Sequence, residues 1–500
     1  MEADVDAAVA DRDPVDVLNN VLLPAMKEVG DKFGAGELIL PFVLQSAEAM
    51  KRAVAQLENY LERQEGVSKG TVVLATVFGD VHDIGKNLVN TILTNNGYTV
   101  HDLGKQVPVN RIIEKAIETE ATAIGLSALL VSTSKQMPLA VQELHRLGME
   151  FPVIIGGAAI NRAYAQRTLF VSDGEPYAPG VFYAKDAFEG LSLMDQLSDP
   201  ERRSELVAAT IAQAQAGMDR PGREAFSVPV EASETTRSAT SLVNPPRPPF
   251  WGVREMTDVR LADVWPHLDQ KTLFRLHWGG KGVRDEAWER LQEDDFAPRL
   301  LRMQAEAERD GWLQPRVRYG FFPANGEGND LVVFDPTEPD REIARFSFPR
   351  QPRRDRLCLA DYFLPMESGK RDVAAFQMVT VGESATLRSE ELQASGEYAE
   401  SFFCHGLSVQ SAEGLAEYAH QRIRRELGIG EEQGKRYSWG YPSCPDLRQH
   451  VIVDQLLDLG TIGVRVTEGF QFEPEQSTAA LVVAHPEARY FALAMSETDV

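Results

Sequence analysis

Cysteine is scarce in this chain of 500 residues. The three cysteines, Cys358, Cys404 and Cys444, lie far apart and form no C-x-x-C pair, so neither a disulfide framework nor a cysteine zinc site is expected. Long apolar runs are also missing, because none approaches the length of about 20 residues that a membrane-spanning helix needs. The amino terminus lacks the basic start and apolar stretch of a signal peptide. We therefore expect a cytoplasmic protein with ordinary thiols.

Basic residues are in short supply as well. The chain has 51 lysines and arginines against 75 aspartates and glutamates, which gives a formal net charge of −24. This charge repels nucleic acid and anionic membranes, so partners are expected to be small molecules or proteins. Because 500 residues with 43% hydrophobic content exceed what one core usually organises, about two to four domains are expected.

The first half of the chain is predicted to contain a helical bundle and a parallel sheet. Residues 14–63 repeat apolar residues at helical spacing, with a break at "GAG", and predict a helical region over 1–66. From 69 to 210, short apolar strands such as "TVVLATV" alternate with helices. This alternation predicts a doubly wound, Rossmann-like (flavodoxin-like) domain with ligands at the carboxyl ends of its strands.

The second half has a different organisation. Residues 211–250 are predicted to be a linker, because Pro, Ser, Thr and Glu accumulate there and periodicity disappears from about 218. Over 251–500, helical stretches such as "EGLAEYAHQRIRREL" mix with separated strands, including "RYFALAM", without regular alternation. We expect an α+β domain there. The predicted fold class is therefore multidomain, α/β followed by α+β.

A histidine follows the first predicted strand, in "GDVHDIGKNLVNTILTNNGYTV" at 79–100. Alone, it could be a metal ligand, an acid or base, or a structurally satisfied residue. Asp80 stands two residues before His82, where its carboxylate can accept the imidazole N–H and fix the tautomer, and Gly85 leaves room for a bulky group. One histidine and one carboxylate cannot hold free zinc, which needs three or four protein ligands. A metal here must bring most of its own ligands, as a corrinoid does.

Three motifs on successive strand ends give a family resemblance. D80-x-H82-x-x-G85, "GLS" at 125–127 and "GG" at 156–157 have the order and context found in the cobalamin-binding module of methyltransferases and mutases, which this sequence resembles. The resemblance implies that His82 replaces dimethylbenzimidazole as the lower ligand of cobalt, while the nucleotide tail enters a glycine-lined channel. It also implies cobalamin contacts for Asn19, Gly79, Asp80, Val81, Asp83, Gly85, Ser127, Val131, Gly156, Gly157 and Ala187.

A hydroxyl residue is expected to complete a catalytic triad with His82 and Asp80. Methionine synthases of the family have a serine where this chain, aligned on "GLSALLVSTSKQM", has Thr133. Threonine keeps the hydroxyl, so a proton relay through Asp80 remains plausible, although the extra methyl restricts the rotamer. Ser132 and Ser134 are the alternatives.

The helical segment resembles the cap that covers the methyl face of cobalamin in methionine synthases. In "VGDKFGAGELILPFVLQSAEAMKRAV", Phe33 and Leu40 fall where a phenylalanine and a leucine shield the cobalt–carbon bond. Spacing alone favours a second interpretation, in which both residues are bundle core. The adjoining cobalamin motifs favour the cap.

The segment "KRYSWGYPSCPD" at 435–446 contains R-x-x-x-G-Y. An arginine can clamp a carboxylate, and a glycine lets backbone approach an adenosyl group, although the motif alone indicates only a surface loop. With "FFPAN", "CLADYF" and "HPEARYFAL", it resembles the activation domain of cobalamin-dependent methionine synthase, which binds S-adenosylmethionine. The resemblance implies that Asp269 holds the amino group, that Arg436 holds the carboxylate, and that Gly440, Tyr441, Tyr490, Phe491 and, more weakly, Glu413 lie nearby.

The resemblance spans almost the whole chain and implies the carboxy-terminal half of a methyltransferase. The family moves a methyl group from methyltetrahydrofolate to homocysteine on cobalamin, and repairs oxidised cofactor with S-adenosylmethionine and an electron from flavodoxin or a similar flavoprotein. During repair, His82 would leave the cobalt and the cap would move aside. The homocysteine domain, with its zinc, and the folate domain are expected outside this chain, which is expected to be a monomer. A corrinoid carrier, or a binding module without turnover of its own, is the alternative.

Overall fold

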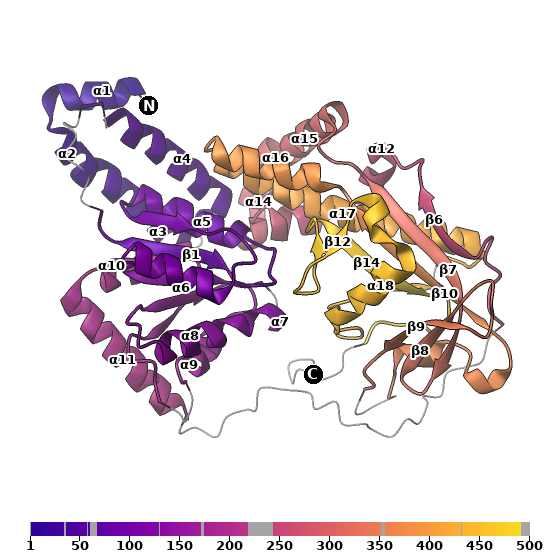
Figure 1. Ribbon diagram of the computed structural model, residues 1–500. Helices are drawn as coiled ribbons and strands as arrows, with labels where there is room; N and C mark the ends of the chain where they lie inside the picture. The colour runs from indigo at the N-terminus through magenta and orange to yellow at the C-terminus, as the bar shows by residue number, and fades with distance from the viewer. Residues whose placement is uncertain are drawn as a thin grey trace. The chain divides into compact units, whose positions relative to one another are not determined.

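The computed structural model describes residues 2–34, 37–57, 59–60, 68–129, 131–171, 175–218, 244–351, 356–431 and 433–491. The chain divides into two compact units, one formed mainly by its first 225 residues and the other by most of the remainder (Figure 1). Each unit has a hydrophobic core of its own. No helix in the described ranges is long and apolar enough to cross a membrane.

The chain begins with helices, as predicted. The longest, α4, spans Leu40–Leu57 and buries Val43, Ala47 and Met50, which recur at helical spacing and so form one apolar face. These residues pack with Met26 and with side chains of the domain that follows. The other helices of this region are α1 Glu2–Asp11, α2 Pro14–Val17, the π-helix η1 Leu18–Leu22 and α3 Leu23–Gly34.

A five-stranded parallel sheet follows, in the order β2-β1-β3-β4-β5. This is the flavodoxin-like order, which confirms the predicted fold class. Strand β2 lies on one side of β1, and β3 lies on the other, so the order of the strands reverses between β1 and β3. Sheets of this kind bind ligands at the carboxyl ends of the two strands that flank this reversal. The strands are β1 Thr71–Thr76, β2 Thr99–Asp102, β3 Ala123–Ser127, β4 Val153–Gly156 and β5 Val181–Ala184.

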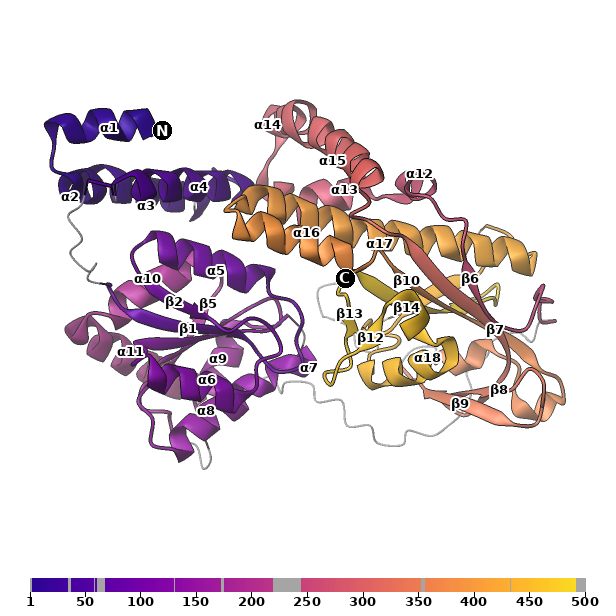
Figure 2. The ribbon, with the colours of Figure 1, turned by 45° about the horizontal axis from the view of Figure 1, so that its top comes forward.

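Helices cover both faces of this sheet. In β1, Val73 points into a core shared with α6 and α8, while the adjacent Leu74 points into a core shared with α5 and α10. Figure 2 shows α5 on one side of the sheet and α6 and α8 on the other. The helices are α5 Ile84–Asn95, α6 Val109–Glu118, α7 Val131–Ser134, α8 Gln136–Arg146, α9 Arg162–Thr168, α10 Ala187–Leu197 and α11 Pro200–Met218, and α11 includes the first residues of the predicted linker.

The second unit is built on an antiparallel sheet in the order β11-β14-β10-β7-β8-β9, with β6 paired to β7. The central strand β10 is buried along its whole length, because neighbouring strands and helices enclose it. The strands are β6 Gly252–Met256, β7 Arg316–Glu327, β8 Asp330–Phe334, β9 Glu342–Ser347, β10 Asp372–Thr380, β11 Lys435–Ser438 and β14 Ser477–Val483, with a small pair β12 Arg465–Val466 and β13 Phe472–Glu473.

The helices of this half confirm the predicted α+β class. The longest, α17 Tyr398–Leu427, contains the predicted "EGLAEYAHQRIRREL". The other α-helices are α12 Leu261–Val264, α13 Gln270–Thr272, α14 Asp285–Leu291, α15 Ala297–Asp310, α16 Glu383–Ala394 and α18 His450–Leu457. The 3-10 and π turns are η3 Trp265–His267, η4 Leu273–His277, η5 Gly280–Gly282, η6 Gln292–Phe296, η7 Leu359–Tyr362, η8 Met366–Ser368, η9 Leu447–Gln449 and η10 Leu459–Ile462.

The strand predicted at 489–495 is absent from the part of it that the structure describes. Within "RYFALAM" at 489–495, residues 489–491 form no strand, and 492–495 lie outside the described residues. Side chains bind the carbonyl groups here instead of a neighbouring strand: Tyr437 donates to the Arg489 carbonyl at 2.8 Å, and Ser443 donates to the Phe491 carbonyl at 2.7 Å.

We predict that Gly157→Ala destabilises the first unit. Gly157 has φ +118°, and an added Cβ would lie 2.1 Å from the Ala128 carbonyl oxygen. The backbone strain should cost about 1 to 3 kcal/mol or more. Gly85→Ala is the matched control, because a Cβ at Gly85 would meet nothing within 4 Å. Thermal unfolding followed by circular dichroism measures both, and equal melting temperatures for the two variants would contradict the prediction.

Candidate functional site: a histidine loop and a distal pocket

The carboxylate of Asp80 lies fully buried at the carboxyl end of β1. Its Oδ1 accepts hydrogen bonds from the His82 backbone N–H at 3.0 Å and lies 2.8 Å from His82 Nδ1. Its Oδ2 accepts from the Leu129 backbone N–H at 2.8 Å and from the Thr133 hydroxyl at 2.5 Å. Asp80 thus joins the loop after β1 to the loop after β3 and to helix α7.

The charge of Asp80 is stabilised by these contacts. Burial raises the pKa of the Asp80 carboxyl, but interactions with His82 and Thr133, chiefly hydrogen bonds, outweigh burial and lower the net pKa below its ordinary value of 3.8. Because the folded-state pKa is lowered, this stabilisation is present at neutral pH and is lost as the pH falls through the lowered pKa. At neutral pH, Asp80 is therefore an ionised acceptor for the His82 ring.

His82 has the geometry of a metal ligand held by a carboxylate. With Nδ1 donating to Asp80, Nε2 carries the lone pair that could bind a metal, and 30% of the side chain is exposed. Within the described ranges, no three His, Cys, Asp or Glu side chains gather closely enough to hold a metal ion. A metal at His82 would have to bring other ligands, and a corrinoid meets this requirement.

The glycines of the strand ends have two different environments. A Cβ at Gly156 would lie 2.9 Å from the Ala184 carbonyl oxygen, so Gly156, like Gly157, is required by close backbone neighbours. Gly85 faces open space. Ser127 ends β3 and pairs in register with Thr76 and Gly156. Gly85, three residues after His82, therefore has no close neighbour on its side-chain side.

The other predicted cobalamin contacts are distributed around this edge. Gly79 turns the chain at φ +79°, Val81 is 2% exposed, Asp83 precedes α5, and Ala187 opens α10 with 4% exposure. The side chains of Asn19, Val131 and Ser132 lie outside the described residues.

Thr133 is the hydroxyl residue that contacts Asp80. Ser134, one of the alternatives, is buried, and its carbonyl accepts from the Tyr164 hydroxyl at 2.7 Å. Asp80 therefore contacts His82 through one carboxylate oxygen and Thr133 through the other. The catalytic roles of the three residues remain predictions.

Phe33 and Leu40 have unequal surroundings. The ring of Phe33 packs against that of Phe188 in α10, with centroids 5.6 Å apart, and joins the core that includes Met26 and Val43. Leu40 is half-buried at the first residue of α4. The contacts of Phe33 are thus those of a residue in the bundle core. That Phe33 and Leu40 shield a cobalt–carbon bond remains a prediction.

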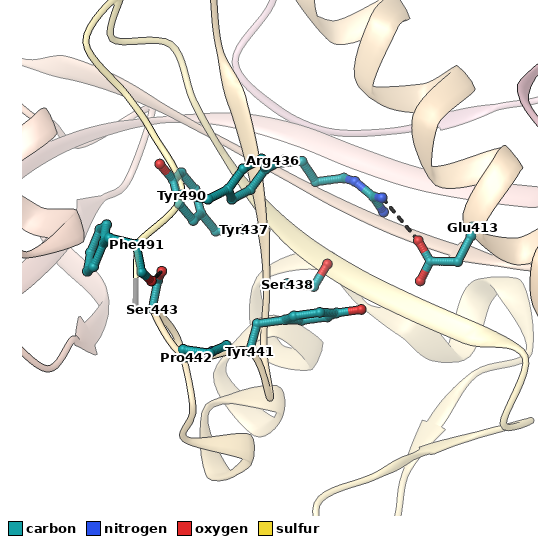
Figure 3. A pocket seen from close by; sticks show the side chains of 9 residues that line it. All are labelled: Glu413, Arg436, Tyr437, Ser438, Tyr441, Pro442, Ser443, Tyr490 and Phe491. Carbon is teal, nitrogen blue, oxygen red and sulfur yellow. Dashed lines mark hydrogen bonds and ion pairs between the residues drawn. The ribbon is translucent and has the colours of Figure 1, made fainter. Parts of the chain in front are cut away.

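A pocket of about 520 Å³ lies in the second unit (Figure 3). Strand β11, the turn after it, helix α17 and the chain beyond β14 contribute its walls. Five of its residues were predicted to bind S-adenosylmethionine, namely Glu413, Arg436, Tyr441, Tyr490 and Phe491, and the others are Tyr437, Ser438, Pro442 and Ser443.

Arg436 is the main charged donor in this pocket. Its Nη2 lies 3.0 Å from Glu413 Oε2, as Figure 3 shows. Its Nη1 is buried and has no hydrogen-bond partner within the described part of the chain. Leaving such a donor unsatisfied costs about 1 to 3 kcal/mol. A ligand carboxylate would satisfy it.

Aromatic side chains surround the arginine. Gly440, at φ +91°, donates its N–H to the Cys444 carbonyl at 2.8 Å and forms the turn that presents Tyr441, which is 62% exposed. The ring centroids of Tyr437 and Tyr490 lie 5.5 Å apart, and the ring planes are inclined by 61°. The pocket therefore combines a cation with exposed aromatic faces.

Asp269 is not among the pocket-lining residues. It is exposed and caps α13, accepting from the Thr272 backbone N–H at 3.0 Å and from the Thr272 hydroxyl at 2.6 Å. The Thr272 hydroxyl is the largest cause of its lowered pKa. Its contact with an amino group stays a prediction.

Several residues of both sites were not predicted. Ser438 and Tyr437 follow Arg436 on β11, and the two-residue spacing of Arg436 and Ser438 in a strand is a signal that could have found Ser438. Ser443 and the Leu129 backbone N–H carry no comparable sequence signal, since their positions depend on distant parts of the chain.

Three family models match this chain. Residues 1–58 and 70–191 each match a B12 binding domain, and residues 261–500 match the activation domain of vitamin B12 dependent methionine synthase. The methionine synthase of Mycobacterium tuberculosis is 41% identical over 98% of this chain, and that of Mycobacterium leprae is 40% identical over 98%. The chain spans 44% and 45% of the length of these relatives.

A solved structure also matches. The MetH reactivation domain bound to AdoHcy is 26% identical, covers 51% of this chain and 85% of its own, and aligns with a TM-score of 0.45.

The fold and the family matches define a cobalamin-binding module followed by an activation domain. Residues 261–500 match the methionine synthase activation domain, and 98% of the chain is similar to part of the Mycobacterium tuberculosis methionine synthase. The predicted resemblance and its cofactor, cobalamin, are thereby confirmed at the level of these domains.

Proposed function

We propose that this chain binds cobalamin beside His82 and S-adenosylmethionine in the pocket around Arg436, and that it serves the reactivation of a methionine synthase. The observation that carries the proposal is the buried Asp80 carboxylate, which holds the His82 ring at the ligand-binding edge of a flavodoxin-like sheet. The activation-domain match supports the second part.

At the first site, His82 Nε2 would be the protein ligand of cobalt. A bound corrinoid would supply the metal that carries the methyl group, together with most of that metal's ligands. Asp80 orients the ring through Nδ1 and would stabilise a proton there, and Thr133 donates to the second carboxylate oxygen. Gly85 would leave space for the cofactor, and Phe33 and Leu40 would shield it from water.

At the second site, Arg436 would bind the carboxylate of S-adenosylmethionine through its unsatisfied Nη1. Tyr441 and Tyr490 offer exposed aromatic faces to the adenine ring or the sulfonium cation. Glu413 lies beside Arg436 and would favour the cationic part of the same ligand. Asp269 would reach the amino group only in an arrangement other than its present cap.

The reaction we propose for this chain is reductive methylation. One electron from flavodoxin or a similar flavoprotein and a methyl cation from S-adenosylmethionine would restore the methylated cofactor, and S-adenosylhomocysteine would leave. Methyl transfer from methyltetrahydrofolate to homocysteine would require the homocysteine and folate domains of the whole enzyme. We propose a cytoplasmic monomer.

A corrinoid carrier or a binding module without turnover is the alternative. The activation-domain match and the Arg436 pocket favour reactivation over a simple carrier. Incubating the cobalamin-loaded chain with a chemical reductant and methyl-labelled S-adenosylmethionine separates the two. Label on the cofactor supports reactivation, and binding of both ligands without label transfer would leave only the binding module.

We predict that His82→Ala changes the visible spectrum of bound methylcobalamin. The parent should show a histidine-ligated spectrum, because Asp80 places the ring at the sheet edge, and the variant should show the spectrum of cofactor without a lower base. The melting temperature before loading controls for misfolding. A folded variant with the spectrum and pH dependence of the parent would remove His82 from the cobalt.

We predict that Arg436→Ala weakens S-adenosylmethionine binding by about 1.5 to 3 kcal/mol, because a charge-assisted contact to the carboxylate is lost. Cobalamin binding should be unchanged. Arg448→Ala is the control, since Arg448 is an exposed arginine paired with Asp446 and lies outside the pocket lining. Isothermal titration calorimetry measures both, and parent-like affinity of Arg436→Ala would exclude Arg436 from the site.

A further inference from the structure

Lys86 is a nearly fully buried lysine directly after Gly85, with 3% of its surface exposed. Its ammonium group contacts both carboxylate oxygens of Asp102, at the end of β2, and also the side-chain oxygen of Asn87. Figure 2 shows α5, which carries Lys86, lying over β1 and β2. This ion pair joins the first turn of α5 to the neighbouring strand.

Asp102 extends the connection into the loop after β2. Its Oδ1 accepts from the Gly104 backbone N–H at 2.8 Å, and its Oδ2 accepts from Asn90 at 3.1 Å. The Asp102 carboxylate therefore binds α5 on one side and the start of the β2–α6 loop on the other.

The same loop holds the backbone that leads into the turn that presents His82. The Gln106 N–H donates to the Asp80 carbonyl at 3.1 Å, and Gln106 adopts φ +58° to do so. The Thr76 N–H donates to the Gly104 carbonyl at 2.9 Å, and the Thr76 carbonyl accepts from the Val107 N–H at 3.0 Å. Hydrogen bonds, together with the covalent backbone of residues 104–106, thus connect Lys86 to the backbone of Asp80.

A buried ion pair is costly in desolvation and is weak evidence for stability. Apolar side chains of similar volume could fill the space between α5 and β2 at no greater cost. An ion pair, however, fixes the relative position of two segments, because the ammonium group must meet the carboxylate oxygens at hydrogen-bond distance. The segments fixed here lie on either side of the His82 turn.

We propose that the Lys86–Asp102 ion pair is a positioning element for His82, setting the angle at which the ring faces the cofactor. This inference rests on the proposed role of His82. Lys86 acts through backbone, by holding the α5 start and the β2–α6 loop against the Asp80 carbonyl, and it is distinct from Asp80, which orients the ring directly. Loss of the pair should loosen the ring without removing any group that contacts it.

The test compares Lys86→Met with Lys115→Met in the full chain. Lys115 is paired with Glu118 on α6 of the same domain, at the surface, so its loss controls for removing a lysine ion pair. Two readouts are used: ¹⁵N chemical shifts of the histidine rings in the cofactor-free protein, with the His82 signals identified by their absence in His82→Ala, and the affinity and visible spectrum of added methylcobalamin.

We expect Lys86→Met to shift the His82 ring signals towards a mixture of tautomers and to weaken cofactor affinity by about 10-fold, the effect typical of losing a partner outside the ligand shell. Lys115→Met should match the parent in both readouts. Parent-like ring signals and spectrum in folded Lys86→Met would overturn the inference.

If Lys86→Met does not fold, Asp102→Asn is the second variant to test, because it removes the negative charge of Asp102 and keeps the size of that side chain. It should shift the same signals in the same direction, and a parent-like result would again overturn the inference. Failure of the proposed function looks different: His82→Ala would then have the cofactor spectrum of the parent. A His82-dependent spectrum that is insensitive to Lys86 and Asp102 rejects the positioning role alone.

Discussion

The cobalamin side of this protein depends on one buried carboxylate. Asp80 accepts hydrogen bonds from the loop after β1, from the loop after β3 and from helix α7. A carboxylate with so many donors remains charged although it is buried. The His82 ring is consequently held at the sheet edge by an acceptor that cannot easily turn away, and the neighbouring backbone is ordered around the same charge.

The strand order explains why this contact lies at the edge where sheets of this kind bind ligands. In the order β2-β1-β3-β4-β5, the ends of β1 and β3 are adjacent, so residues 49 apart in sequence, Asp80 and Leu129, meet there. The activation domain uses a different arrangement, in which an antiparallel strand presents Arg436 to a pocket with aromatic walls. In each candidate site a carboxylate holds the side chain that is proposed to meet the ligand, Asp80 for His82 and Glu413 for Arg436.

Sequence patterns predicted the local parts of this structure well. The D-x-H spacing predicted the Asp80–His82 contact, because two residues in one turn can meet without help from the rest of the chain. Alternating strands and helices predicted the parallel sheet. The Lys86–Asp102 pair and the Leu129 N–H could not be predicted, since each depends on which strand ends become neighbours. "RYFALAM" misled because its apolar side chains suggest a strand, whereas Tyr490 and Phe491 form no strand and line the pocket.

The most direct test of the account is Asp80→Asn in the cobalamin-loaded chain. An amide can accept the ring N–H but carries no charge, so orientation can survive while stabilisation of a proton on His82 is lost. The account predicts that the variant still binds cobalamin, but that histidine ligation, followed in the visible spectrum, changes at a different pH and takes up fewer protons. A variant that titrates at the pH of the parent with the same proton uptake would contradict it, and would make Asp80 a structural loop residue.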